Sequence, residues 1–413
     1  MMLDMAKRAK SASKILSMLS ADVKNKALLN MAEALVKNSE RILEANAKDV
    51  EAAKARGVRP VLMDRLILTE NRIKGMSRCL KETVELPDPI GEIIKTWTRP
   101  NGLIIGQIRT PLGIVAIIYE SRPNVTSDIA GICLKSGNAV ILRGGSDSMN
   151  SNIVIGDILR EAASSSGVPI DAIQVVGTKD RSATLELMQL RGYIDVLIPR
   201  GGAELIKFVK DNAKVPLIEY GEGNNHTYVA EDADLDNAID IVINAKTQRP
   251  GVCNALDKLL VHEAVSKTFI PLIVSSLRKS GVKVKGCEKT REIVSDVEAA
   301  TEEDWYKEYL DLIISIKVVN DLAEAIDHIN KYGTQHSDAI LSKSFEKAWR
   351  FIREVDSATT YWNASIRFTD GNEFGLGAEV GISTQKLHAR GPMSVEQMTT
   401  TKYFVLGHGQ IRE

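Results

Sequence analysis

The sequence has no apolar run long enough to cross a bilayer. Its longest, residues 114–119, falls far short of the roughly 20 apolar residues that a membrane-spanning helix needs. Residues 1–14 are charged and amphipathic, without the apolar core of a secretory signal. Neither sign of charge is in excess, because 53 Lys and Arg residues balance 54 Asp and Glu residues, so no global attraction to nucleic acid or anionic lipid exists. We expect a soluble cytoplasmic protein that binds neither nucleic acid nor membrane.

Cysteine and histidine are scarce and scattered. The four cysteines include no C-x-x-C pair, and none of the six histidines stands at a zinc-ligand spacing from a cysteine. This pattern predicts free thiols in a reducing compartment and no metal site. The cysteines are Cys79, Cys133, Cys253 and Cys287.

Two common nucleotide-binding signatures are also missing. Neither the G-x-G-x-x-G fingerprint of dinucleotide-binding folds nor the Walker A sequence of P-loop proteins occurs. The remaining composition, with 44% apolar and 26% charged residues, is that of an ordinary globular protein. Because 413 residues exceed what one hydrophobic core serves, we expect two or three domains.

The order of the predicted elements indicates an α/β fold. Residues 1–80 have the apolar periodicity of helices, and residues 96–112 form a predicted hairpin around Asn101-Gly102. From there, buried strands alternate with helices, which implies a doubly wound parallel sheet. We expect its strands at 113–119, 139–142, 173–176, 194–198 and 215–219.

A second α/β series follows Gly221-Glu222-Gly223. Its expected strands lie near 227–230, 258–261, 312–318 and 338–341, and each is followed by a predicted helix or by the turn to one. The remaining residues are rich in glycine and polar side chains and end in a predicted strand at 402–406.

One cysteine stands out by its surroundings. Cys253 follows the Pro250-Gly251 bend and precedes the apolar run 256–261, so a turn presents it. Arg249 is a nearby cation that favours the thiolate, which is the nucleophilic form. The alternative is a buried structural cysteine, the usual fate of a free thiol.

Three predicted strand ends carry residues suited to a site, because ligands on open α/β sheets bind beyond the carboxyl ends of the strands. The segment 120–126 places Asn124 in the first turn of a helix, where its amide can stabilise an oxyanion or simply cap the helix. The other two turns hold glycine pairs whose backbone amides suit phosphate, although such turns are common without any ligand. They are Arg143-Gly144-Gly145-Ser146 and Gly201-Gly202.

Longer segments resemble a known family. They are YESRPNVT (119–126), QRPGVCNAL (248–256), NASIRFTDG (363–371), FGLGAEVGIS (374–383) and KLHARGPM (386–393). Their order is similar to that of the aldehyde dehydrogenase superfamily, and the segments resemble its branch that reduces an acyl phosphate. The similarity covers essentially the whole chain.

The resemblance implies an aldehyde dehydrogenase-like α/β fold with two doubly wound parallel-sheet domains and a small β oligomerisation arm. Residues 1–95, 113–225 and 371–398 are then the NADPH-binding domain, and residues 226–370 the catalytic thiol domain. Residues 96–112 and 399–413 form the arm, whose exposed strand edges predict a homodimer or higher homo-oligomer.

The resemblance also assigns roles to single residues. Cys253 stands where the family has its catalytic thiol, and Asn124 matches the side-chain donor of its oxyanion hole. Arg143 and Ser146 fall where the superfamily binds the adenosine ribose with Lys and Glu. Because Ser replaces a carboxylate beside Arg143, NADPH is favoured over NADH. Glu308 resembles the Glu that holds the nicotinamide ribose.

The implied reaction is the reduction of L-glutamyl 5-phosphate by NADPH, through a thioester on Cys253, in the second step of proline biosynthesis. Arg122, Arg249 and Arg367 are candidate cations for the substrate phosphate and carboxylate, or else surface ion-pair residues. Glu219 resembles the base that activates water in aldehyde oxidation, which a reductase should exclude, so it is left out of the catalytic set.

Two rival functions remain open at the level of sequence. One is an aldehyde-oxidising dehydrogenase that uses NAD(P), and the other is a catalytically silent nucleotide-binding scaffold. The implied partners of the reductase are its substrate, further copies of the chain and the upstream glutamate kinase.

Overall fold

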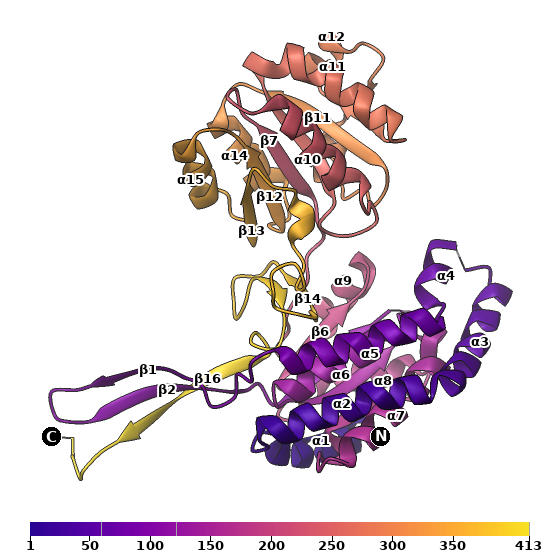
Figure 1. Cartoon of the computed structure of the whole chain (residues 1–413), viewed down its shortest axis with the longest axis vertical. Coiled ribbons are helices and arrows are strands. Elements are labelled where there is room, and N and C mark those ends of the chain that lie inside the picture. Colours follow the sequence, from indigo (N-terminus) through magenta and orange to yellow (C-terminus); the bar gives the residue numbers. More distant parts are fainter. Residues whose placement is uncertain (59, 121, 413) are drawn as a thin grey trace. The chain divides into compact units, whose positions relative to one another are not determined.

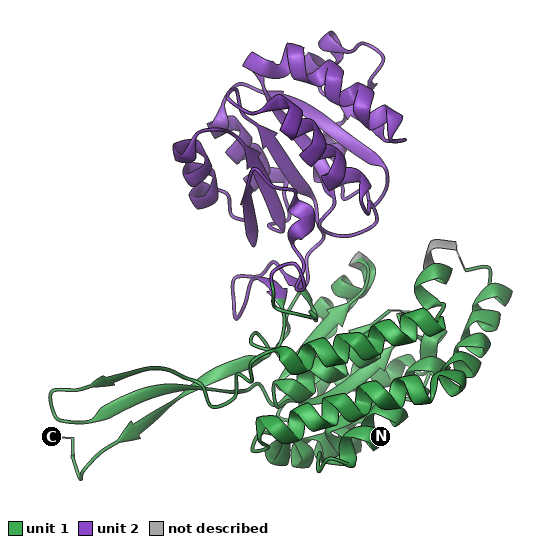
Figure 2. Ribbon diagram, viewed as in Figure 1, with its two compact units in different colours: residues 1–219, 375–381, 393–413 green, residues 220–374, 382–392 purple. Residues whose placement is uncertain are grey.

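The computed structural model describes residues 1–58, 60–120 and 122–412, so Ser121 of the segment 119–126 lies outside the described residues. The chain forms two compact units (Figure 2). Unit 1 comprises residues 1–219, 375–381 and 393–413, and unit 2 comprises residues 220–374 and 382–392. Within the described ranges, no helix is both long and apolar enough to cross a membrane.

Unit 1 begins with helices, as the periodicity of residues 1–80 predicts. The first of them packs Met2, Ala6 and Ala9 into the same core as strand and helix residues further along the unit. The helices are α1 (Met2–Leu16), α2 (Ala21–Lys37), α3 (Ser39–Ala55), α4 (Pro60–Leu66) and α5 (Glu70–Glu85).

The parallel sheet of unit 1 has the strand order β5-β4-β3-β6. The chain runs from the central β3 (Ile114–Tyr119) to β4 (Ala139–Gly144) and β5 (Ile173–Val175) on one side, then returns to β6 (Val196–Arg200) on the other. Every residue of β3 and β4 is buried, as in a parallel sheet covered on both faces. The strand order reverses at β3, and such a switch point is where open α/β sheets bind ligands.

Helices connect these strands (Figure 1). A short 3₁₀ turn precedes α7 in the connection from β4 to β5. The connecting elements are α6 (Asn124–Lys135), η1 (Ser146–Ser148), α7 (Met149–Ser164), η2 (Ile170–Ala172), α8 (Arg181–Gln189) and α9 (Ala203–Asn212).

A separate antiparallel sheet forms the predicted arm within unit 1 (Figure 1). Its order is β1-β2-β16, with β1 (Ile93–Thr98), β2 (Ile104–Pro111) and β16 (Thr399–Leu406). Gly102 turns the hairpin with a φ of 83°, a conformation that glycine adopts without strain. The outer strands β1 and β16 expose large apolar side chains, among them Ile93, Tyr403 and Val405.

Unit 2 contains the larger sheet, in the order β10-β9-β11-β8-β7-β12-β13. All its strand pairs are parallel. The strands are β7 (Asn225–Val229), β8 (Leu256–His262), β9 (Lys283–Gly286), β10 (Glu298–Ala299), β11 (Ile313–Val319), β12 (Ser337–Leu341) and β13 (Thr359–Trp362).

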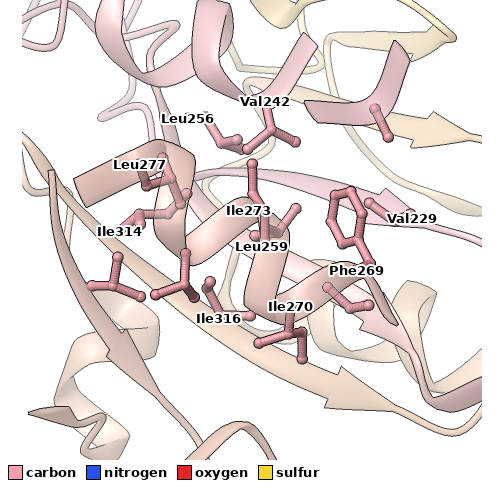
Figure 3. Close-up of a cluster of buried hydrophobic side chains, with 14 of the residues drawn as sticks. Val229, Val242, Leu256, Leu259, Phe269, Ile270, Ile273, Leu277, Ile314 and Ile316 are labelled. Atoms are coloured by element: carbon pink, nitrogen blue, oxygen red, sulfur yellow. The ribbon is translucent and has the colours of Figure 1, made fainter. Parts of the chain in front are cut away.

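Helices cover both faces of this sheet. On one face, Leu259 and Val229 pack against Phe269, Ile273 and their neighbours on α11 (Figure 3). On the other face, Tyr228 and Leu260 pack against α14 and α15. The helices are α10 (Leu235–Thr247), α11 (Glu263–Lys279), α12 (Glu288–Ile293), α13 (Glu302–Tyr306), α14 (Leu322–Tyr332) and α15 (Phe345–Glu354), with the 3₁₀ turn η3 (Ile366–Phe368).

The strand predicted at 215–219 is wrong. This segment makes only an isolated bridge between Leu217 and Leu197, because Pro216 has no N–H to continue a ladder. The short strands β9, β10 and β13 were not predicted, since four or fewer partly exposed residues show no clear alternation.

The units differ from the expected domains in three places. The change of unit at Glu219–Tyr220 comes a few residues before the expected boundary, and residues 371–374 and 382–392 belong to unit 2. A bridge between Tyr220 and Ser383 ties this second segment to the start of unit 2. The remaining strands of this region are β14 (Gly381–Ser383) and β15 (Gly391–Met393), which pair with each other.

Candidate active site

Cys253 lies on the turn that links α10 to β8 in unit 2, where its side chain is half-buried. The adjacent strand β7 fixes this turn. The Asn225 side-chain amide donates to the carbonyl oxygens of Cys253, at 2.7 Å, and of Ala255, at 2.8 Å. The thiol is therefore borne on a turn whose backbone is held from the neighbouring strand.

The chain also passes very close to Cys253 at Gly223. A Cβ atom at position 223 would lie 1.5 Å from the Cys253 carbonyl oxygen, so no residue other than glycine fits there. The Gly223 N–H donates to Glu308 Oε1 at 2.8 Å. Glu308 therefore holds the segment that packs against the cysteine turn.

Two of the predicted cations belong to the same site. Arg367, on η3, donates to the Gln248 side chain at 2.9 Å, and Asn254 donates to the Arg367 carbonyl oxygen at 3.2 Å. Burial lowers the pKa of Arg367, and the charge of Arg249 lowers it further, whereas the charge of Cys253 opposes both. The structure thus brings Arg249 and Arg367 into the electrostatic environment of Cys253, where positive charge favours the thiolate.

Glu308 is half-buried beside a fully buried lysine. Its pKa is raised to about 7, chiefly by burial and also by the charges of Asp257 and Glu222, against the opposing effect of the Gly223 N–H. Lys258 donates to the Lys307 carbonyl oxygen at 2.8 Å and lies over the Tyr309 ring, and burial lowers its pKa to about 8. The Glu308 carboxyl therefore changes charge close to neutral pH.

Asn124 is the first residue of α6 in unit 1. Its amide does not cap that helix, which has Pro123 at its N-cap; it donates to Asp128 Oδ2 at 3.0 Å, one helical turn later. Arg122 is exposed just before the helix.

At the predicted ribose-binding turn, at the end of β4, the cation already has hydrogen-bond partners within the protein. Arg143 is 6% exposed, and its guanidinium donates to the Gly144 carbonyl oxygen and to Thr184. Asp49 accepts the N–H groups of the first turn of α7, with Ser151 at 2.8 Å. Of the predicted residues at this turn, Ser146 is the exposed one.

Gly201 and Gly202 lie at the carboxyl end of β6, before α9. The Gly202 N–H donates to Glu120 Oε2 at 3.1 Å. A Cβ atom at Gly201 would lie 2.6 Å from the Glu120 carboxyl carbon. The backbone N–H groups of this exposed turn can therefore bind an anionic group. In this structure the Gly202 N–H binds the Glu120 carboxylate.

Four residues that contact the predicted ones were not themselves predicted. In unit 1 they are Glu120 and Asp128, and in unit 2 Gly223 and Asn225. Glu219, which was left out of the catalytic set, forms an ion pair with Lys210 at 3.0 Å. Among the described residues, no three His, Cys, Asp or Glu side chains are arranged to hold a metal ion.

A family model, the aldehyde dehydrogenase family, matches residues 2–293. The chain belongs to the aldehyde dehydrogenase family. A gamma-glutamyl phosphate reductase of Moorella thermoacetica is 56% identical over 98% of this chain and 97% of its own. One of Caldanaerobacter subterraneus is 55% identical over 99% of each chain.

Solved structures agree with this assignment. The crystal structure of gamma-glutamyl phosphate reductase from Thermotoga maritima covers 100% of both chains with a TM-score of 0.98 and 52% identity. An acetylating aldehyde dehydrogenase from Geobacillus thermoglucosidasius has a TM-score of 0.71 over 100% of this chain and 97% of its own, at 19% identity, and shares the fold. The chain therefore belongs, within the aldehyde dehydrogenase family, with the gamma-glutamyl phosphate reductases.

Proposed function

We propose that this chain catalyses the NADPH-dependent reduction of L-glutamyl 5-phosphate to L-glutamate 5-semialdehyde and phosphate, the second step of proline biosynthesis. The observation that carries the proposal is full-length similarity, at 55–56% identity, to enzymes named for this reaction. The half-buried Cys253 turn supplies the chemistry that the reaction needs.

The Cys253 thiolate is the proposed nucleophile. It forms a bond to the γ-carbonyl carbon of the substrate, and the bond from that carbon to the phosphate oxygen breaks, so that phosphate leaves with the electron pair. Arg249 and Arg367 supply positive charge near the thiol for the anionic substrate, and Arg122 is the third candidate.

The tetrahedral oxyanion needs donors. We assign this part to the Asn124 amide and to the Cys253 N–H, each worth about 3 kcal/mol in comparable sites. The thioester carbonyl carbon then accepts a hydride, and the resulting hemithioacetal oxyanion collapses to the aldehyde as the Cys253 thiolate leaves. Two electrons reduce the acyl group, and the thiol is regenerated.

The reduced nicotinamide cofactor supplies the hydride when it is bound. Unit 1 fits a dinucleotide, because the carboxyl ends of β3 and β6 meet at a switch point that carries Gly201, Gly202 and the N-terminus of α9. The Gly202 N–H there already holds an anionic group, the Glu120 carboxylate, which a cofactor phosphate must replace. Glu308 is the proposed partner of the nicotinamide ribose.

Three finer assignments belong to the same proposal. NADPH is preferred over NADH, because Ser146 offers no carboxylate to repel a 2′-phosphate, and Arg143 and the Gly144-Gly145 turn lie beside it. The arm sheet makes the enzyme a homodimer or higher homo-oligomer. The enzyme works in the cytoplasm, where glutamate kinase hands over the labile acyl phosphate.

Trapping of the acyl-enzyme tests the proposal. The enzyme is mixed with L-glutamyl 5-phosphate, generated in place by glutamate kinase and ATP, without NADPH. Mass spectrometry should then find a glutamyl group on Cys253 and none in Cys253→Ala, which should still bind NADPH. An unmodified Cys253 in the wild-type enzyme would sink the mechanism.

The reverse reaction separates this function from plain aldehyde oxidation. Reduction of NADP⁺ by glutamate semialdehyde should require phosphate. A rate that is independent of phosphate would favour the aldehyde-oxidising alternative.

A further inference from the structure

A half-buried carboxylate, that of Asp128, lies one helical turn after Asn124 in unit 1. Asn124 Nδ2 donates to Asp128 Oδ2 at 3.0 Å, and the Ser127 hydroxyl lies 3.2 Å from Asp128 Oδ1. The nitrogen end of the Asn124 amide, which is its donor end, faces this carboxyl. The contact therefore determines which way the amide points.

A second helix supplies a neighbour of this carboxylate. Burial and the charge of Asp128 raise the pKa of the Cys79 thiol on α5, so the two side chains lie close together. The two helices pack very closely next to this contact, since a Cβ atom at Gly131 of α6 would lie 2.5 Å from Leu80 of α5. The pair Asn124–Asp128 thus rests on a rigid helix–helix contact.

An asparagine side chain that donates to an oxyanion has to be held in one orientation. Its terminal torsion is broad, with two nearly equivalent orientations that exchange nitrogen and oxygen. An amide turned the wrong way would present its oxygen to a developing oxyanion and repel it. With one N–H engaged by Asp128, the second N–H of Asn124 remains available as a donor.

We propose that Asp128 is a positioning residue of the reaction: together with Cys79, it fixes the Asn124 amide in the orientation that donates to the oxyanion. The inference rests on the proposed role of Asn124. It adds Asp128 of α6 and its neighbour Cys79 of α5, both half-buried, to the part of the enzyme that stabilises the transition state.

A double-mutant cycle tests this inference. The reverse reaction is measured for the wild-type enzyme, Asn124→Ala, Asp128→Ala and the double variant, with kcat and the KM values for phosphate and NADP⁺. Asn124→Ala should lower kcat by about 10²-fold, and Asp128→Ala by a large part of that factor. In the double variant, kcat should equal that of Asn124→Ala within about 2-fold, because Asp128 has nothing left to position. The KM values should change little.

A conservative variant and a matched pair of cysteine variants keep the test independent of folding defects. Asp128→Asn retains an oxygen that accepts from Asn124 and should recover most of kcat. Cys79→Ala should lower kcat in the wild-type background and not in Asn124→Ala, whereas Cys133→Ala, which removes a buried thiol elsewhere on α6, should behave alike in both. If Asp128→Ala does not fold, the cycle is run with Cys79→Ala.

The outcomes separate the two levels of the proposal. Losses that multiply in the double variant would show a merely structural role and overturn the positioning of Asn124 by Asp128. An unchanged kcat in Asn124→Ala would overturn the role of Asn124 and this inference together. Acylation of Cys253, by contrast, is decided by the trapping experiment alone.

Discussion

The side chain of Asn225 holds the carbonyl oxygen of Cys253 at 2.7 Å. The same amide donates to Ala255 O, and its oxygen accepts the Ser337 N–H at 3.1 Å. One fully buried side chain therefore joins β7, the cysteine turn and β12. The position of the proposed nucleophile thus depends on a residue of the neighbouring strand that itself has no reactive group.

Replacement of Asn225 by alanine should loosen this turn. Three backbone groups lose their partner, two of them in buried contacts. Leaving a buried polar group unsatisfied costs about 1–3 kcal/mol before relaxation. We expect a loss of several degrees in Tm and a lower kcat. Calorimetry and the reverse assay measure both. A variant with wild-type Tm and kcat would show that the turn holds itself in place.

Alanine at position 223 should be far more damaging than alanine at an open glycine. In Gly223→Ala the new Cβ would collide with the Cys253 carbonyl oxygen, so the cysteine turn must move and activity should fall by at least 10²-fold. Gly75→Ala is the matched control, because it lies in α5 with open space around it and should stabilise the helix by about 0.5–1 kcal/mol. Equal activities of the two variants would contradict the close approach seen at Gly223.

The buried Glu308 should make stability depend on pH. Its carboxyl titrates near pH 4.5 in the unfolded chain and near pH 7 in the folded one, so the folded state binds more protons between these values. Stability therefore falls as pH rises through this window, by roughly 1–3 kcal/mol. Urea midpoints at pH 5, 6 and 7 should show the decline, and Glu308→Gln should flatten it.

A surface glutamate provides the control for this measurement. Glu298 is exposed, and its hydrogen bond to Lys283 lowers its pKa, so it titrates below the window. Glu298→Gln should leave the slope between pH 5 and 7 unchanged. A slope that survives in Glu308→Gln would assign it to another group.

A carboxylate at position 146 should weaken the preference for NADPH. Ser146 is the exposed residue of the turn after β4, and a negative charge there would repel a 2′-phosphate. We expect Ser146→Glu to lower the ratio of kcat/KM for NADPH to that for NADH by on the order of 10-fold or more. Ser165→Glu, at the other end of α7, carries the same charge change and should leave the ratio as it is. An unchanged ratio in Ser146→Glu would place the 2′-phosphate elsewhere.

The apolar strands of the arm should mediate assembly. Val405 on β16 is 54% exposed, and such side chains on a strand edge are typical of interfaces. Val405→Asp should shift the mass in solution toward the 45.3 kDa of one chain, as seen by light scattering. Met18→Asp replaces an apolar residue that is 84% exposed outside the arm and should not. A wild-type mass for Val405→Asp would argue against the arm.

The fold was largely predictable, because buried parallel strands such as 114–119 and 139–144 are continuous apolar runs that few other structures produce. The family and the implied fold are confirmed by the full-length relatives. Local sequence patterns did not predict the strands correctly where strand pairing depends on residues far away in the sequence. The segment 215–219 is apolar enough for a strand, yet Pro216 prevents the ladder. The short strand β9 has too few residues to show a pattern.

The candidate site was predictable only in its chemically distinctive residues. Cys253 is marked by the bend before it, and Asn124 by the helix start. The role of Asp128 could not be predicted, because it depends on the Cys79 thiol of α5, which lies far earlier in the chain. Arg143 shows the opposite limit: a cation at a strand end suggested a phosphate, whereas its guanidinium lies buried among backbone and hydroxyl partners.

The last strand of the arm sheet, β16, is synthesised close to the end of translation. Gln107 on β2 and Thr401 on β16 are hydrogen-bonded partners 294 positions apart. One edge of β2 therefore stays unpaired while the ribosome synthesises all of unit 2. A chain that stalls before residue 399 would carry that edge uncovered, free to pair with the same edge of another unfinished copy. We therefore expect the hairpin to be the segment of an unfinished chain that nascent-chain quality control recognises first.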